Sequence, residues 1–189
     1  MNRLGTQAVV KNLPIVAERP GLIQKLIAAN VAFYGAYQFV TGPTRVRLSR
    51  EFTLQPESGI QAAFTYHFAH TSLAPMLFNS FVLATVGSQL YAAQGCAAFT
   101  RVLLVGAAGA SLFALADMRS NSNQVQAGGL GLSAALISYS AFRAPQYLSL
   151  LRFNPTLLVP AFIAYSLMYN DKSVLGGTCA GYAAFLLAL

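Results

Sequence analysis

Charged side chains are scarce in this sequence of 189 residues and make up only 9% of it. An average soluble domain has roughly 25%. Because 56% of the residues are hydrophobic, the composition predicts a membrane protein. Acidic residues number only five against twelve Lys and Arg, which gives a net charge of +7. The basic residues lie singly or in short groups between apolar runs, which argues against nucleic-acid binding and indicates residues that set membrane topology.

Tryptophan is absent and cysteine is rare. Without Trp, Tyr and Phe must supply any aromatic belt at the membrane surface. Cys96 and Cys179 lie in apolar surroundings with no C-x-x-C spacing, so the sequence suggests neither a disulfide framework nor a zinc site. We expect both thiols to be buried and inert.

The first 20 residues are basic, with Glu18 as their one acid. They lack the uninterrupted apolar core and the small-residue cleavage site of a secretory signal. A mitochondrial address stays open, and so does a tail facing the cytosol or matrix. We treat residues 1–20 as a basic N-terminal segment and residues 21–189 as the transmembrane domain.

Apolar runs alternate with short polar breaks from residue 21 onward. Several runs are about 17 residues long, near the lower limit for a hydrocarbon core of roughly 30 Å. Pro160 is expected to kink the fifth run, and the polar stretch at 41–59 is expected to form a loop. The expected spans are about 22–41, 65–91, 97–116, 127–142, 154–169 and 173–189.

If successive loops lie on alternate sides of the membrane, the two sides carry unequal shares of the twelve basic residues. The side of the N-terminus carries Arg3, Lys11, Arg19, Lys25, Arg101, Arg143 and Arg152. The opposite side carries Arg45, Arg47, Arg50, Arg119 and Lys172. The positive-inside rule therefore favours an N-terminus on the cytosolic or matrix side.

Small residues gather within the runs, as in AAGAS at 107–111, GGLGLSAA at 128–135 and GGTCAG at 176–181. Since apolar surfaces gain little from meeting each other in lipid, helices pack there through close backbone approach. These segments predict a compact helical bundle.

The second run contains polar and small residues at a characteristic spacing. It resembles the motifs F-x-H, H-x-x-x-N and G-x-x-x-E-x-x-x-G of the rhomboid family, which comprises six-helix intramembrane serine proteases and inactive relatives. Pro75 stands where the family has a histidine that helps to hold the oxyanion, and Tyr91 where it has glutamate. The matching residues are Phe68, His70, Asn79, Gly87 and Gly95.

Two later segments extend the resemblance over about residues 22–189. GLSA at 131–134 resembles the family's G-x-S-G turn, which places Ser133 at the position of the nucleophile. Gly177 and Gly181 match the glycines of H-x-x-G-x-x-x-G, whose histidine is the general base, but Val174 occupies the histidine position. The resemblance implies an all-α bundle of six transmembrane helices.

The departures from these motifs remove groups that the serine-protease activity implied by the resemblance would need. A serine hydroxyl is a weak nucleophile until a base takes its proton, and Val174 has no acceptor. Pro75 has no N–H with which to stabilise an oxyanion. We therefore expect no catalytic residues, with His70, Asn79 and Ser133 as vestigial positions.

His67 and His70 raise the alternative of a metal or haem site. Two neighbours on one helix cannot hold a haem from both sides, and no carboxylate or thiolate lies nearby in sequence. We expect hydrogen-bonded structural histidines and no cofactor. The glycines at 128–131 lack the G-K-[ST] ending of a phosphate loop, so helix initiation or packing explains them better.

The leading functional hypothesis is a pseudoprotease that acts by binding. It would hold transmembrane segments of other subunits, or membrane lipids, within a multi-subunit complex, with the mitochondrial inner membrane as the preferred location. A respiratory, ATP synthase or translocase assembly would suit it, and no nucleic acid or small-molecule substrate is expected.

Three other functions stay open. One is a rhomboid-type serine protease with an unconventional base, and another is a quality-control factor similar to the derlins, whose cytosolic tails this chain lacks after Leu189. A transporter is the third, although the nearly charge-free spans do not favour it.

Overall fold

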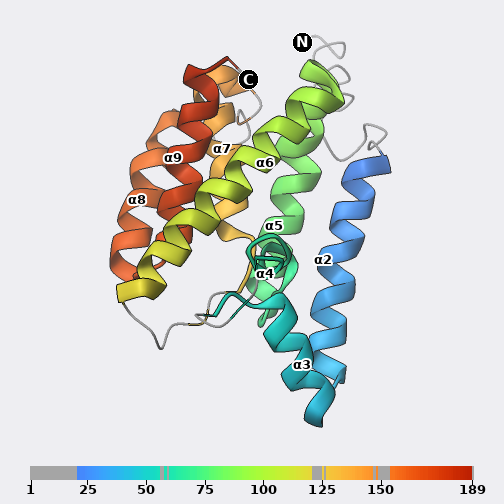
Figure 1. The fold of residues 1–189 in the computed structure, drawn as a ribbon. Helices are drawn as coiled ribbons and strands as arrows, with labels where there is room; N and C mark the ends of the chain where they lie inside the picture. The colour runs from blue at the N-terminus through green and yellow to red at the C-terminus, as the bar shows by residue number, and fades with distance from the viewer. Residues whose placement is uncertain are drawn as a thin grey trace.

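The computed structural model describes residues 21–55, 58, 60–120, 125, 127–146, 148 and 154–188. The regular structure of these residues is a bundle of helices, shown in Figure 1. The expected basic segment at 1–20 lies outside the described residues, as do Arg152 and Leu189.

Helix α2 (Gly21–Phe39) is the first long helix, and α3 (Gly42–Phe52) follows it directly. Helix α3 lies inside the stretch that the sequence predicted to be a loop, so that prediction was wrong. Pro43 stands in its first turn, where a missing N–H removes no intrahelical bond, and this was an available sign of a helix start. Figure 1 shows α3 projecting beyond the end of α2.

A short helix α4 (Ala62–Thr65) and a 3₁₀ turn η1 (Tyr66–Phe68) precede the next long helix, α5 (Leu73–Val82). The predicted second span therefore begins several residues too early. Ala69 and Ser72 have extended backbone conformations, which interrupt the helical path between η1 and α5. His70 thus lies on a connecting segment and does not share a helix face with His67.

Helix α5 continues through a π turn, η2 (Leu83–Gly87), into α6 (Ser88–Ser120). Gly95 has a φ of 84° and divides α6, so that the chain rises to Gln94 and then returns from Cys96 (Figure 1). The rising stretch from Leu73 to Gln94 is about 33 Å long at 1.5 Å per residue. Among the described residues, Leu73–Arg119 is the one helix long and apolar enough to cross a membrane by length and composition alone.

The remaining helices are α7 (Leu130–Arg143), α8 (Leu158–Tyr169) and α9 (Lys172–Leu186), with a 3₁₀ turn η4 (Pro155–Leu157) before α8. Pro160 lies in the first turn of α8, where the backbone N–H groups have no intrahelical partner in any case. The predicted kink at Pro160 was therefore wrong. Pro155–Tyr169 is apolar but shorter than a typical span.

Helix α9 packs against both α6 and α7, through the small residues that the sequence indicated. A Cβ atom on Gly177 would overlap the carbonyl oxygen of Gly131, and one on Gly181 would overlap that of Ala135. The packing role expected for these two glycines is thus confirmed. Every residue of α7 from Gly131 to Ala141 is buried, which makes α7 the central helix.

The expectation that both cysteines are buried was wrong. Cys96 and Cys179 are exposed, because Cys96 follows the Gly95 turn and Cys179 shares the outward stripe of α9 with Tyr182 and Leu186. Gly95 does not pack on a helix face, since a Cβ there would meet no atom within 4 Å. Its role is the positive φ that reverses the chain.

Candidate functional site

The structure brings together Asn79 and Ser133, two of the residues that the sequence analysis predicted to be vestigial positions, which lie 54 residues apart in sequence. Asn79 comes from α5 and Ser133 from the first turn of α7, and both are buried. The Ser133 Oγ–H donates a hydrogen bond of 2.5 Å to Asn79 Oδ1. An amide oxygen accepts a hydrogen bond but is not a base at neutral pH, so this contact holds the serine proton in place.

The glycine pair before α7 makes this contact possible. Gly128 has a φ of 109°, and Gly129 is the N-cap residue of α7. A Cβ atom on Gly129 would overlap the Asn79 amide and the His67 carbonyl oxygen. The role in helix initiation expected for the 128–131 glycines is therefore confirmed, and the same glycines let α5 approach Ser133.

Val174 occupies the position at which the resemblance would place a base. Contact between Gly177 and Gly131 fixes the register of α9 on α7, and Val174 lies one turn before that contact. Its side chain is buried and apolar. Neither of the chain's two histidines makes a hydrogen bond to Ser133.

His67 is bonded to α6 and is not directed at Ser133. Its Nε2 lies 3.2 Å from Ser111 Oγ, and that hydroxyl also lies 2.6 Å from the Ala63 carbonyl and 2.8 Å from the Ala107 carbonyl. Since the single hydroxyl proton goes to a carbonyl, Nε2–H of His67 is assigned as the donor to Ser111. His67 therefore joins the η1 turn to α6, as expected of a structural histidine.

His70 does not meet the expectation of a hydrogen-bonded side chain. It is buried, yet both ring nitrogens lack a partner among the described residues. A Cβ on Gly128 would lie 3.5 Å from Nδ1, so the neighbour on that side is glycine backbone.

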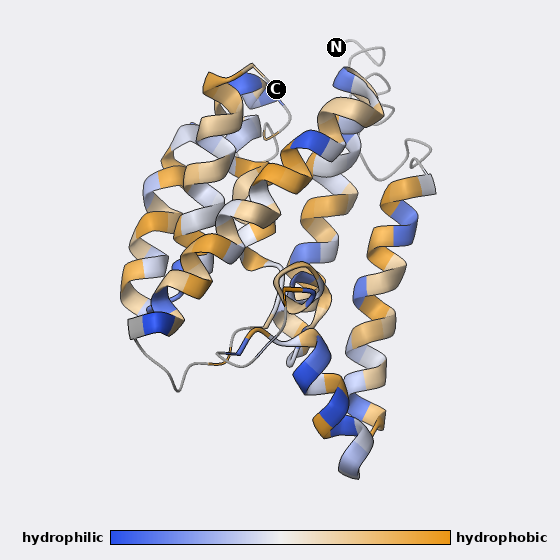
Figure 2. Ribbon diagram, in the orientation of Figure 1, coloured by the Kyte–Doolittle hydropathy of each residue, from blue (hydrophilic) through white to orange (hydrophobic). Residues whose placement is uncertain are grey.

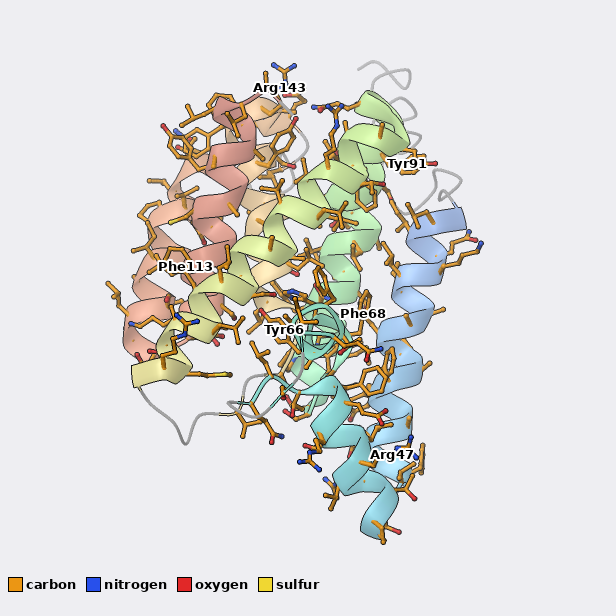
Figure 3. All side chains as sticks on the ribbon, viewed as in Figure 1. Arg47, Tyr66, Phe68, Tyr91, Phe113 and Arg143 are labelled. Atoms are coloured by element: carbon orange, nitrogen blue, oxygen red, sulfur yellow. The ribbon has the colours of Figure 1, made fainter. Side chains whose placement is uncertain are left out.

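The other two departures from the motif lie at different levels of the bundle. Pro75 is in the first turn of α5, one turn before Asn79, and offers no donor there. Tyr91 packs edge-on against Phe99, with ring centroids 5.8 Å apart. Figure 3 shows Tyr91 near one end of the bundle, away from Tyr66 and Phe68 at its centre.

An apolar pocket of about 360 Å³ opens beside Val174, and the sequence did not reveal it. It lies between α5 and α8, with the start of α7 and Val174 of α9 as its inner side. Because four helices contribute lining residues, no single segment of the sequence predicts the pocket. Only the lining residues of α8 repeat at helical spacing. The lining residues are Phe78, Leu130, Leu158, Ala161, Phe162, Tyr165 and Val174.

No cluster of three or more His, Cys, Asp or Glu side chains that could hold a metal ion occurs in the part of the chain that the structure describes. The pocket is instead bounded almost entirely by carbon. The arrangement as a whole offers an apolar binding surface beside a hydrogen-bonded serine.

A comparison with protein-family models identifies a relationship. The family model of the rhomboid domain matches residues 58–188, which include α4 to α9 and both Asn79 and Ser133. A search of the curated proteins finds no match.

Proposed function

The chain belongs to the rhomboid family, and from this we propose that it is an integral membrane protein without protease activity that binds other transmembrane segments. The observation that carries the proposal is the surroundings of Ser133. Its hydroxyl donates to Asn79, and a valine stands at the position of the base. Without a base, the serine cannot become a nucleophile.

The pocket beside Val174 supplies the binding surface in this proposal. A transmembrane helix has an apolar surface, and it gains from van der Waals contact with a complementary groove in lipid. Phe78 of α5 and Phe162 of α8 line the pocket together with the buried Val174. The valine that removes the base therefore also makes the wall apolar, which suits an occupant that is held and not cleaved.

We further propose six membrane spans and a place in a multi-subunit complex of the mitochondrial inner membrane, such as a respiratory, ATP synthase or translocase assembly. Division of α6 at Gly95 gives six long helical stretches in the order that the sequence predicted. The basic, nearly acid-free N-terminal 20 residues support a mitochondrial location with the N-terminus in the matrix. Large exposed side chains such as Met168 and Leu186 offer surfaces for neighbouring subunits or lipid.

Site-specific photo-crosslinking in the native membrane tests this proposal. A photoreactive amino acid at Phe162 should give one discrete protein adduct, and the tagged chain should co-migrate with a large complex in native electrophoresis. The matched control is Leu112, which is 65% exposed on α6, outside the pocket. A probe at Leu112 should not give the same adduct.

A pocket-filling variant, Ala161→Trp, separates binding in the pocket from contact elsewhere. It should abolish the Phe162 adduct while the chain still folds and inserts. A chain that migrates alone, or a Phe162 adduct that persists in Ala161→Trp, would overturn the proposed role.

A further inference from the structure

Helix α3 presents one stripe of residues to an open cavity. Gly42, Arg45, Val46, Ser49 and Arg50 are spaced by three or four residues, so they share a helix face. With Tyr37 of α2 and Gln55 beyond the end of α3, they line a cavity of about 540 Å³. This cavity is distinct from the apolar pocket beside Val174.

The cavity carries two positive charges without acidic partners. Arg47 lies off the stripe and pairs with Glu51, whose Oε1 is 2.9 Å from Arg47 Nε. Within the described part of the chain, neither Arg45 nor Arg50 forms an ion pair, and no acidic residue lines the cavity. The site therefore presents two guanidinium groups to whatever occupies it, which favours an anion.

Contacts within the cavity wall hold its shape. The guanidinium of Arg45 lies over the Tyr37 ring, 5.0 Å from its centroid, which links α3 to α2. Gln55 Nε2 donates to Thr53 Oγ1 at 2.8 Å, and Thr53 Oγ1 donates to the Ser49 carbonyl at 2.6 Å. The polar groups of the wall are thus oriented before an anion arrives.

The position of α3 places this cavity at one boundary of the membrane. Helix α3 begins just after α2 ends, and Figure 2 shows hydrophilic residues concentrated on it while the long helices are largely hydrophobic. Arg47 and Arg143 lie at opposite ends of the molecule in Figure 3. Val46 in the cavity wall is 69% exposed, and Phe39 at the end of α2 is 87% exposed, so apolar side chains are available near the arginines. Such a combination suits the headgroup level of a bilayer.

We propose that this cavity binds the phosphate group of an anionic glycerophospholipid. Arg45 and Arg50 donate charge-assisted hydrogen bonds to the phosphate oxygens, and the acyl chains lie along Val46 and Phe39. Basic pockets beside membrane helices recognise anionic headgroups in this way. The inference does not depend on what occupies the pocket beside Val174.

Native mass spectrometry of the purified full chain with added lipid tests the site. Dioleoyl phosphatidylglycerol should be retained about 25-fold more tightly than dioleoyl phosphatidylcholine, with about fivefold from each of the two arginines. Because each arginine near the surface contributes roughly fivefold to binding of an anionic lipid, Arg45→Gln and Arg50→Gln should each weaken phosphatidylglycerol binding by about that factor. The double variant should remove the preference.

Arg47→Gln is the matched control, because it removes the same charge from the same helix outside the cavity. It should leave the preference for phosphatidylglycerol unchanged, and equal losses in Arg47→Gln and Arg45→Gln would overturn the proposal.

Competition with inorganic phosphate is a second experiment, which distinguishes a lipid site from a site for a soluble anion. If phosphate alone displaces the lipid at millimolar concentration, the site takes a soluble anion and the lipid assignment fails. Arg45→Lys keeps the charge and should retain part of the preference, which guards against a folding defect in the Gln variants.

Discussion

Ser133 is a buried serine whose hydroxyl already donates a hydrogen bond within the protein. In an activated serine the hydroxyl donates to a base that can keep the proton, whereas here it donates to the side-chain oxygen of Asn79. The bond joins α5 to α7 at a point where both side chains are buried. The bond therefore gives both residues a structural role in the bundle.

Replacing Ser133 should lower stability. In Ser133→Ala, the buried oxygen of Asn79 loses its donor, which costs about 1–3 kcal/mol in the free energy of unfolding. For a chain of this size, each kcal/mol shifts Tm by roughly 2–4 °C. Thermal unfolding of the purified protein in detergent measures the change.

The control for this prediction is Ser80→Ala. Ser80 also lies on α5 but is only half-buried, and its hydroxyl contacts the Met76 sulfur. Its replacement should leave Tm nearly unchanged. If Ser133→Ala is as stable as Ser80→Ala, the bond to Asn79 does not stabilise the bundle.

At the scale of elements, the α7–α9 crossing fixes the position of everything around Ser133. The backbone of α9 touches that of α7 at Gly177 and Gly181, which leaves no room for a side chain between them. This register sets Val174 beside Leu130 at the inner side of the apolar pocket. The glycines therefore determine where Val174 stands, which is the position that the resemblance assigns to a base.

A methyl group at this crossing should separate the two helices. Gly177→Ala would overlap the Gly131 carbonyl and should cost about 1–3 kcal/mol, which is typical of overpacking. Gly35→Ala is the matched control, because Gly35 lies in α2 with no atom within 4 Å of an added Cβ. Thermal unfolding should show a lower Tm for Gly177→Ala and an unchanged or higher one for Gly35→Ala; equal values would contradict the close crossing.

The sequence predicted these helix contacts better than it predicted the connections. Gly177 and Gly181 were identifiable because small residues at i and i+4 mark one helix face. By contrast, the start of α5 at Leu73 depends on the extended backbone of Ala69 and Ser72, which hydropathy does not register. Helix α3 was missed because polar residues suggested a loop, although Pro43 indicated a helix start.

Side-chain environments were the least predictable part of the candidate site. The apolar pocket combines residues from four helices, so it exists only in the folded bundle. Exposure of Cys96 and Cys179 depends on which face of each helix turns outward. The resemblance singled out Asn79 and Ser133 separately, but the hydrogen bond that joins them was not predicted.

For the whole molecule, the structure joins a rhomboid scaffold to two binding surfaces of different character. The pocket beside Val174 is apolar and lies among the long helices, whereas the α3 cavity is basic and lies at the end of the bundle. Neither surface requires a reactive group. This arrangement is consistent with a rhomboid-like membrane protein whose proposed role is to hold segments and lipids in an assembly.

Cleavage of a transmembrane substrate tests the central claim most directly. The purified protein in lipid vesicles is incubated with a panel of transmembrane peptides, alongside Ser133→Ala and an active rhomboid protease as a positive control. We predict that the unaltered chain gives no more product than Ser133→Ala, because Ser133 has no base at Val174 and its proton is held by Asn79. Product that forms with the unaltered chain and disappears in Ser133→Ala would contradict the account.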